Sequence, residues 1–193
     1  MKELHGQFRE ESISGAEAFS SAEGKDVFPG SRAIVLKAGG SGCEAAEMTW
    51  GFLNPKGKGL LINARAETAL RKPAFSESIL HRRCVIPASR FYEWDHAKTK
   101  VTFYRPQKDM LYFAGCYRLF EDGERFVILT TAANESMKET HDRMPVILEK
   151  EEIAEWILKE REMDRFLAKE MPKLLHEQEY EQIRMELSTT PEE

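Results

Sequence analysis

A glutamate within a run of aromatic residues is the first place in this sequence where chemistry is expected. Glu93 lies in the segment Arg90-Phe91-Tyr92-Glu93-Trp94. On a β-strand, Phe91 and Glu93 would share one face, and Tyr92 and Trp94 the other. A carboxylate among rings loses hydration, so we expect the pKa of Glu93 to rise, which suits a general acid or base near neutral pH. The alternative is a glutamate that faces solvent or pairs with an arginine.

A histidine and an asparagine are the next candidates. His141 lies in a loop between a predicted strand and Pro145, two residues before Arg143. Its imidazole could transfer protons near neutral pH. Asn63 ends an apolar predicted strand, and Arg65 follows on the same face. The Asn63 amide could orient a substrate, but asparagine is also an ordinary residue where a strand turns.

Arginine and tryptophan side chains indicate a binding function for the same region. Single-stranded nucleic acid needs cations along its backbone and flat faces on which exposed bases stack. The middle of the chain is basic although the net charge is −5, and a local positive potential can attract a polyanion. The phosphate candidates are Arg65, Arg82, Arg83, Arg90 and Arg143, and the stacking candidates are Trp50 and Trp94. The alternative places the tryptophans in the core and the arginines in surface ion pairs.

Missing patterns argue against several other functions. The sequence contains no His or Cys spacing typical of a metal site, no glycine-rich phosphate loop and no GxSxG serine, so we expect neither a metal nor a cofactor. Cys43, Cys84 and Cys116 are far apart and odd in number, which favours reduced thiols in a cytoplasmic protein over a disulfide framework. No basic segment followed by an apolar one opens the sequence, so we expect no secretion, and no apolar run is long enough to span a membrane.

The middle of the chain is predicted to be rich in strands, because it contains short runs of β-branched and aromatic residues. The expected strands are 33–36, 48–53, 60–63, 84–86, 91–94, 101–104, 111–117 and 126–131. The turn signal Glu121-Asp122-Gly123-Glu124 predicts a hairpin between the last two strands. One or two helices are expected around 66–70 and 76–81, and helical spacing of apolar residues predicts helices at 151–158 and 164–170.

These elements predict an α+β fold with an antiparallel, barrel-like β core and peripheral helices. We expect a single domain over residues 1–193. Residues 1–32 would form a partial N-terminal flank, 33–148 the core, and 149–193 the C-terminal helices and tail. The last residues are expected to pack at an edge or fray.

Six segments, in this order, resemble the SOS-response-associated peptidase (SRAP) family, which includes 5-hydroxymethylcytosine-binding proteins that shield abasic sites. The segments are WGF, NARAET, RRCVIPASRFYEW, LYFAGCY, ILTTAAN and HDRMPVIL, between residues 50 and 148. The resemblance implies a barrel-like α+β fold and recognition of abasic sites in single-stranded DNA. It also implies a monomer in the cytoplasm, associated with the nucleoid when bound to DNA.

In the SRAP family, a cysteine after the initiator methionine condenses with the open sugar aldehyde to give a thiazolidine crosslink, and the peptidase-like step matures the N-terminus. By resemblance, Asn63 positions the N-terminal residue, Glu93 shuttles protons, and His141 assists proton transfer and crosslink reversal. The resemblance also implies the DNA contacts, which are Trp50, Arg65, Arg143 and, with weaker support, Thr130.

The start of the chain departs from the family pattern. It reads Met1-Lys2-Glu3-Leu4, so the sequence as written is not expected to form the thiazolidine. One explanation is that a true N-terminal segment with Met-Cys lies upstream, which is favoured because the three other site residues are in place. The alternative is a single-stranded DNA-binding module that does not crosslink. A protease acting on other proteins is a third candidate, but no nucleophile–base pair can be named for it.

Overall fold

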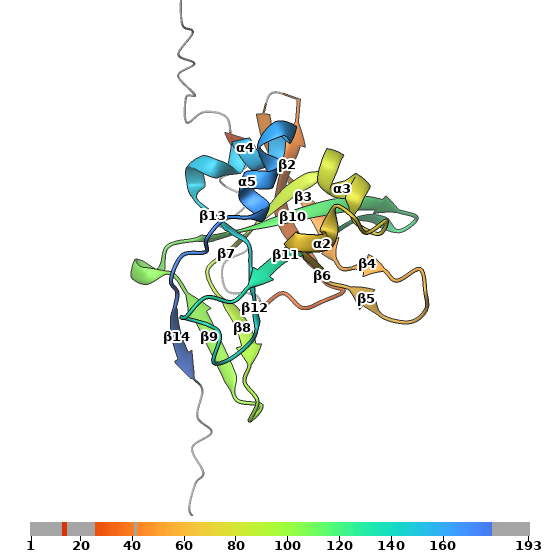
Figure 1. Cartoon of the computed structure of the whole chain (residues 1–193). Coiled ribbons are helices and arrows are strands. Elements are labelled where there is room, and N and C mark those ends of the chain that lie inside the picture. The colour runs from red at the N-terminus through yellow and green to blue at the C-terminus, as the bar shows by residue number, and fades with distance from the viewer. Residues whose placement is uncertain (1–12, 15–25, 41, 179–193) are drawn as a thin grey trace, which may run out of the picture.

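Five strands form a closed barrel in the computed structural model, which describes residues 13–14, 26–40 and 42–178 (Figure 1). The strands are β2 (Arg32–Gly39), β3 (Gly42–Trp50), β7 (Arg83–Ala88), β10 (Leu111–Phe120) and β11 (Gly123–Ala132). They pair in the order β3-β2-β7-β10-β11, and β11 also pairs with β3. The ring therefore closes where the end of β3, at Thr49 and Trp50, meets the start of β11, at Arg125 and Phe126.

The barrel is a mixed sheet, whereas an antiparallel one was expected. The pairs β3–β2, β2–β7, β7–β10 and β10–β11 are antiparallel, and β11 pairs parallel with β3. The reason is geometric: four reversals of direction bring β11 back to the direction of β3, so the pair that closes a five-stranded ring must be parallel. The α+β class, the barrel-like core and the peripheral helices are confirmed.

Shorter strands extend the barrel at the ends of β10 and β11. β6 (Asn63–Arg65) runs parallel to β11, and β12 (Arg143–Pro145) runs antiparallel to it. β13 (Ile147–Leu148) pairs with β10, and β1 (Ile13–Ser14) pairs with β3. The segments NARAET, which begins with β6, and HDRMPVIL, which contains β12, therefore both lie beside β11.

The barrel has an inner and an outer apolar cluster, because side chains alternate between the two faces of each strand. Val35, Ile86, Phe113 and Phe126 belong to the inner cluster. Their sequence neighbours belong to the outer cluster, which the described helices cover. Those helices are α2 (Ala66–Ala69), α3 (Ser76–His81), α4 (Ile153–Leu158) and α5 (Met163–Leu167), with single turns at Pro106–Lys108, Lys150–Glu152 and Glu160–Glu162.

Gly115 on β10 allows close packing inside the barrel. A Cβ at this position would lie 2.6 Å from Ile86 Cδ1 and 2.7 Å from the carbonyl oxygen of Val127. Those distances are too short for any side chain, so β10 approaches its neighbours only because residue 115 is glycine. This position could not be recognised from the sequence alone.

A second, three-stranded sheet packs against the inner cluster. It contains β8 (Phe91–Trp94), β9 (Lys100–Tyr104) and β14 (Leu175–Gln178). The Phe91 ring stacks on Phe103 and meets Phe113 of the barrel edge-on. Figure 1 shows this sheet at the opposite end of the molecule from α4 and α5. A separate hairpin of β4 (Phe52–Leu53) and β5 (Leu60–Leu61) projects at the side.

Most sequence predictions of single elements are confirmed. The helix at 76–81 and the strand at 91–94 have the expected bounds, and the β10–β11 hairpin forms around the predicted turn. The helix expected at 164–170 is shorter, ending at Leu167. The start of the tail packs at an edge, where β14 pairs with β9, and the prediction for residues 179–193 lies outside the described residues, as does most of the expected flank at 1–32. Among the described helices none is long and apolar enough to cross a membrane.

Candidate functional site

Glu93 lies on the face of β8 that packs toward the barrel. It is the cross-strand partner of Val101, which is fully buried in the inner cluster. Two residues earlier, Phe91 faces the same way and stacks on Phe103. Burial among these groups raises the pKa of the Glu93 carboxyl, and the nearby His141 acts in the opposite direction. The expected rise is confirmed, because desolvation disfavours the charged form.

His141 interacts electrostatically with Glu93, so the structure brings these two candidates together. The ring lies in the loop between β11 and β12, and Arg143 holds it through its backbone. The Arg143 N–H donates to Nδ1 at 3.0 Å, and the Arg143 carbonyl lies 3.1 Å from the same nitrogen. A neutral ring can accept at Nδ1 and a protonated ring can donate there, so Nδ1 has a partner in either state. Nε2 is left for another group.

Asn63 and Arg65 occupy β6 and are both exposed, with the buried Ala64 between them. Asn63 begins this strand, whereas the sequence predicted that it ends one. The register sets Asn63 opposite Ile128 of the inner cluster and Arg65 opposite Thr130. Neither side chain forms a hydrogen bond or an ion pair within residues 26–40 and 42–178. These two groups therefore have hydrogen-bonding capacity left for a ligand.

Trp50 has a structural role at the end of β3. Its Nε1 donates to the carbonyl of Ile62 at 3.0 Å, and its ring stacks on Phe126 with centroids 6.3 Å apart. One ring face and the polar atom are therefore already used, so the core alternative describes this tryptophan better than a free stacking platform. Trp94 differs, because it is 53% exposed on the outer face of β8.

Arg143 is bound to a carboxylate that the sequence analysis missed. Its Nη1 and Nη2 donate to the two carboxylate oxygens of Glu67 at 2.8 and 2.9 Å, and Nη2 also donates to the carbonyl of Thr130. The Arg143 side chain is 18% exposed, and Thr130 is 8% exposed. Arg143 is thus in an ion pair, as the alternative expected, but its side chain is mostly covered rather than on the surface. The only signal in the sequence for this pair was that Glu67 lies within the segment NARAET, and Glu67 is 76 residues before Arg143.

Two other phosphate candidates are structural. Arg83 is buried, and it donates to the carbonyls of Ile79, Leu80, Trp156 and Ile157. These carbonyls lie at the C-terminal ends of α3 and α4, where helices leave acceptors unsatisfied. Arg82 pairs with Glu77 at 2.9 Å. The remaining candidate, Arg90, lies over the Tyr92 ring.

The described residues provide no metal site. No group of three or more His, Cys, Asp or Glu side chains within them could hold an ion. Cys43, Cys84 and Cys116 are free and buried, and desolvation raises the pKa of each thiol. Buried thiols with raised pKa values are poor nucleophiles and poor ligands.

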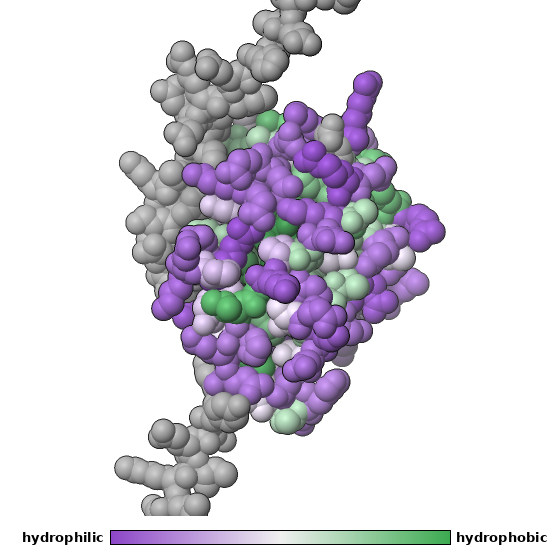
Figure 2. All heavy atoms as spheres, turned by 60° about the vertical axis from the view of Figure 1, so that its left-hand side comes forward, coloured by the Kyte–Doolittle hydropathy of each residue, from purple (hydrophilic) through white to green (hydrophobic). Residues whose placement is uncertain are grey.

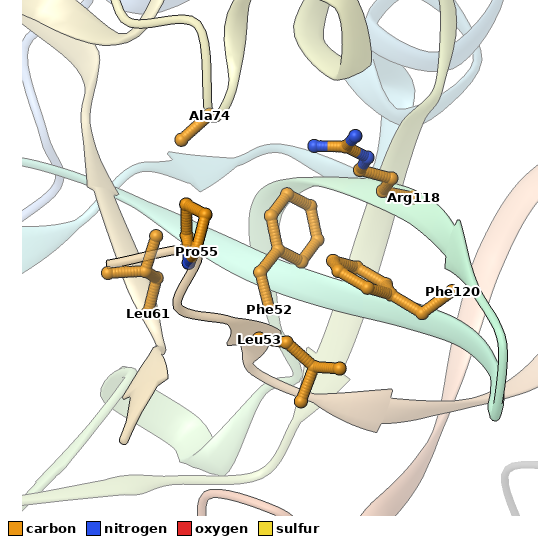
Figure 3. A pocket seen from close by; sticks show the side chains of 7 residues that line it. All are labelled: Phe52, Leu53, Pro55, Leu61, Ala74, Arg118 and Phe120. Atoms are coloured by element: carbon orange, nitrogen blue, oxygen red, sulfur yellow. The ribbon is translucent and has the colours of Figure 1, made fainter. Parts of the chain in front are cut away.

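A cavity of about 200 Å³ lies between the β4–β5 hairpin and the end of β10 (Figure 3). It is lined by Phe52, Leu53, Pro55, Leu61, Ala74, Arg118 and Phe120. Phe52 belongs to the outer cluster, whereas Glu93 faces the inner one. The cavity therefore belongs to a different part of the molecule from the polar candidates. Figure 2 shows that the left-hand side of Figure 1 presents a mainly polar surface with small apolar patches.

The candidates thus gather on one face. Four candidates pair with residues of β11 whose side chains face the inner cluster, and therefore face it too. They are Trp50, Asn63, Arg65 and Arg143. Glu93 faces the same cluster from β8 and interacts with His141. An acid of raised pKa beside an imidazole can move protons, and a free amide and a free guanidinium can hold a polar, anionic ligand.

Comparison with known proteins identifies the family. The family described as SOS response associated peptidase (SRAP) matches residues 1–189. The abasic site processing protein YoaM of Bacillus subtilis (strain 168) is 36% identical over 146 residues, which are 68% of this chain. The matched part is 64% of YoaM, so the chain spans less than two thirds of that relative. YedK of Escherichia coli (strain K12), also named an abasic site processing protein, is 28% identical over 143 residues, covering 70% of this chain and 64% of YedK.

Solved structures agree on the fold. A protein from Bacteroides thetaiotaomicron superposes with a TM-score of 0.65 at 26% sequence identity, covering 77% of this chain and 74% of that one. A protein from Bordetella bronchiseptica gives a TM-score of 0.70 at 22% identity, covering 80% of this chain and 87% of that one. The second likeness concerns the fold alone.

Proposed function

Because the chain belongs to the SOS response associated peptidase (SRAP) family, we propose that it recognises abasic sites in single-stranded DNA and processes them. The observation that carries the proposal is the burial of Glu93 on the inner face of β8, which raises the pKa of its carboxyl, together with its electrostatic interaction with His141. Relatives named abasic site processing proteins support the substrate class. We further propose that the protein acts as a cytoplasmic monomer that associates with the nucleoid through DNA.

Glu93 and His141 suit the chemistry of an abasic sugar. Opening the sugar ring removes a proton from the 1′-hydroxyl and adds one to the ring oxygen, leaving an aldehyde. A carboxyl group with a raised pKa can accept the first proton and donate the second. His141 Nε2 can take the same roles from the other side, because Arg143 already holds Nδ1. Asn63 would orient the reacting group through its free amide.

The DNA-binding part of the proposal depends on Arg65. Its guanidinium is exposed, lies on the Asn63 face of β6 and has no ion-pair partner among the described residues. Arg143, in contrast, is neutralised by Glu67. We therefore assign phosphate binding first to Arg65, and expect Trp94 to offer the better stacking surface of the two candidate tryptophans.

Crosslinking through a thiazolidine requires a cysteine whose α-amine is free, since both the amine and the thiol add to the aldehyde carbon and water leaves. Cys43, Cys84 and Cys116 are internal and buried, so they do not fit that role. We propose that crosslinking needs a Met-Cys start. The second candidate function is a non-crosslinking DNA-binding module, favoured by the exposed Trp94 and by Arg65, which has no ion-pair partner in the part of the chain that the structure describes.

Fluorescence anisotropy with two labelled oligonucleotides tests the proposal. One strand carries a single abasic site and the other is intact. We expect tighter binding to the abasic strand, a strong decrease of affinity with salt, and loss of the preference in Glu93→Gln. Glu155→Gln, a surface change on α4, is the matched control and should bind as the unmodified chain does. Equal affinity for both strands would reject abasic-site recognition and leave the binding module.

A denaturing gel tests the covalent step. The chain is compared with a version that carries Met-Cys before its first residues, each incubated with the abasic strand. We expect a shifted band only for the Met-Cys version, and a slower reaction when Glu93→Gln is added. Absence of the band from the Met-Cys version would reject crosslinking while leaving the anisotropy result intact.

A further inference from the structure

We propose that Glu67 is a positioning residue that acts on His141 through Arg143. The inference rests on the proposed function, in that His141 is taken as a proton-transfer group of the site. Glu67 does not belong to the reacting set, because its two carboxylate oxygens are bound to Arg143. Its effect reaches the His141 imidazole through the side chain of Arg143 and then through the Arg143 backbone.

The first step is the double hydrogen bond between Glu67 and Arg143. Glu67 lies in the first turn of α2, directly after β6. Arg143 is the first residue of β12, so the pair joins two strands on opposite edges of β11. Arg143 holds the pKa of the Glu67 carboxyl below its usual value, and the Thr131 side chain adds to this effect. A bidentate arginine–carboxylate pair fixes orientation as well as distance.

The second step runs from Arg143 to His141 through the backbone. Both backbone polar groups of Arg143 lie within hydrogen-bonding reach of His141 Nδ1. The intervening residue is also fixed, because the Ala133 N–H donates to the carbonyl of Asp142 at 3.0 Å. The Asp142 carboxylate oxygen Oδ1 also lies 3.4 Å from Nδ1. The plane of the imidazole is therefore set by the positions of residues 142 and 143, and Nε2 takes the direction that remains.

The third step is what happens without Glu67. The Arg143 side chain is 18% exposed, and its Nε is buried with no hydrogen-bond partner among the described residues. If the carboxylate is removed, the guanidinium keeps the Thr130 carbonyl as its acceptor. A mostly covered cation that has lost its carboxylate is costly, so the side chain should move toward water and shift residue 143 with it. The Nδ1 partners of His141 would then loosen.

Nitrogen NMR of the histidine rings tests this in the full chain without DNA. A neutral ring held as one tautomer gives two well-separated nitrogen shifts, whereas a loosened ring exchanges and the shifts converge. We expect separated shifts for His141 with the proton on Nε2, partial convergence in Glu67→Gln, which keeps one acceptor, and full convergence in Glu67→Ala. His141→Gln identifies the resonances, and thermal melting shows that each variant is folded.

Glu155→Gln is again the matched control, because it removes a carboxylate bound to Arg165 and Lys159 on α4 and should leave the His141 shifts unchanged. The inference is overturned if folded Glu67→Gln and Glu67→Ala both keep the His141 shifts of the unmodified chain. It is equally overturned if Glu155→Gln moves them as much. Since the readout needs no DNA, a failure here is distinct from equal binding of abasic and intact strands.

Discussion

Polar side chains differ between the two sides of the barrel: those on the outer side, which the helices cover (the covered side), have hydrogen-bond partners, whereas several on the inner side (the open side) have none among the described residues. On the outer side, beneath α3 and α4, Arg83 donates to four carbonyls and the Trp156 Nε1 donates to the carbonyl of Cys84 at 2.9 Å. On the inner side, the side chains of Asn63 and Arg65 have no hydrogen-bond partner within residues 26–40 and 42–178, and burial raises the pKa of Glu93. Satisfied polar groups stabilise a fold, whereas groups with spare capacity bind and react.

The largest effect is expected on the covered side. Arg83→Ala removes the donor that four helix-end carbonyls share, so we expect a loss of about 3 kcal/mol in the free energy of unfolding. Urea denaturation measures it as a lower midpoint at unchanged slope. Arg82→Ala is the matched control, because its neighbouring guanidinium is part of a surface pair with Glu77 and should cost under about 1 kcal/mol. Equal losses in the two variants would contradict the comparison.

A smaller effect of opposite sign is expected on the open side. The pKa of Glu93 is raised in the folded state, so the folded protein binds more protons than the unfolded chain, and stability should fall as the pH rises past the ordinary carboxyl pKa. Glu93→Gln removes this dependence and should gain about 0.5 kcal/mol at neutral pH. Thermal melts at several pH values measure both. A large loss of stability would instead identify Glu93 as a structural partner.

The smallest effect on stability is expected for a carboxylate that forms only surface ion pairs. Glu155 pairs with Lys159 and Arg165 on the surface of α4, and these cations lower the pKa of its carboxyl. Glu155→Gln should cost less than about 0.5 kcal/mol, because water screens such pairs. The loss should appear above the ordinary carboxyl pKa and vanish as the pH falls through the lowered value. Acid titration of the melting temperature checks both statements.

Local signals explain what could be predicted. The strand at 91–94 and the helix at 76–81 follow from residues adjacent in the sequence, and both have the expected bounds. The rise in the pKa of Glu93 was also predictable, because Phe91 of the same strand shares the face of Glu93. The parallel closure of β3 on β11 was not, since it depends on the number of strands in the ring.

The environments of three arginines show most clearly what the tertiary structure adds to the sequence. Arg65, Arg83 and Arg143 were equivalent phosphate candidates in the sequence. In the fold, one is exposed, one is buried under two helices, and one is bound to a carboxylate 76 residues away. Nothing near Arg143 in the sequence indicates Glu67, because the pair forms only when β6 and β12 both join β11.

The sequence by itself determined the family, the alternation of strands and the chemical types at the site, because these depend on residue identity and short-range spacing. Only the tertiary structure decided which polar groups meet. Interactions between distant segments, such as the ion pair of Glu67 with Arg143 and the electrostatic interaction of Glu93 with His141, depend on register and barrel closure. An arginine therefore caps helix ends, as Arg83 does, pairs with a carboxylate, as Arg143 does, or stays exposed, as Arg65 does, according to what the fold places next to it.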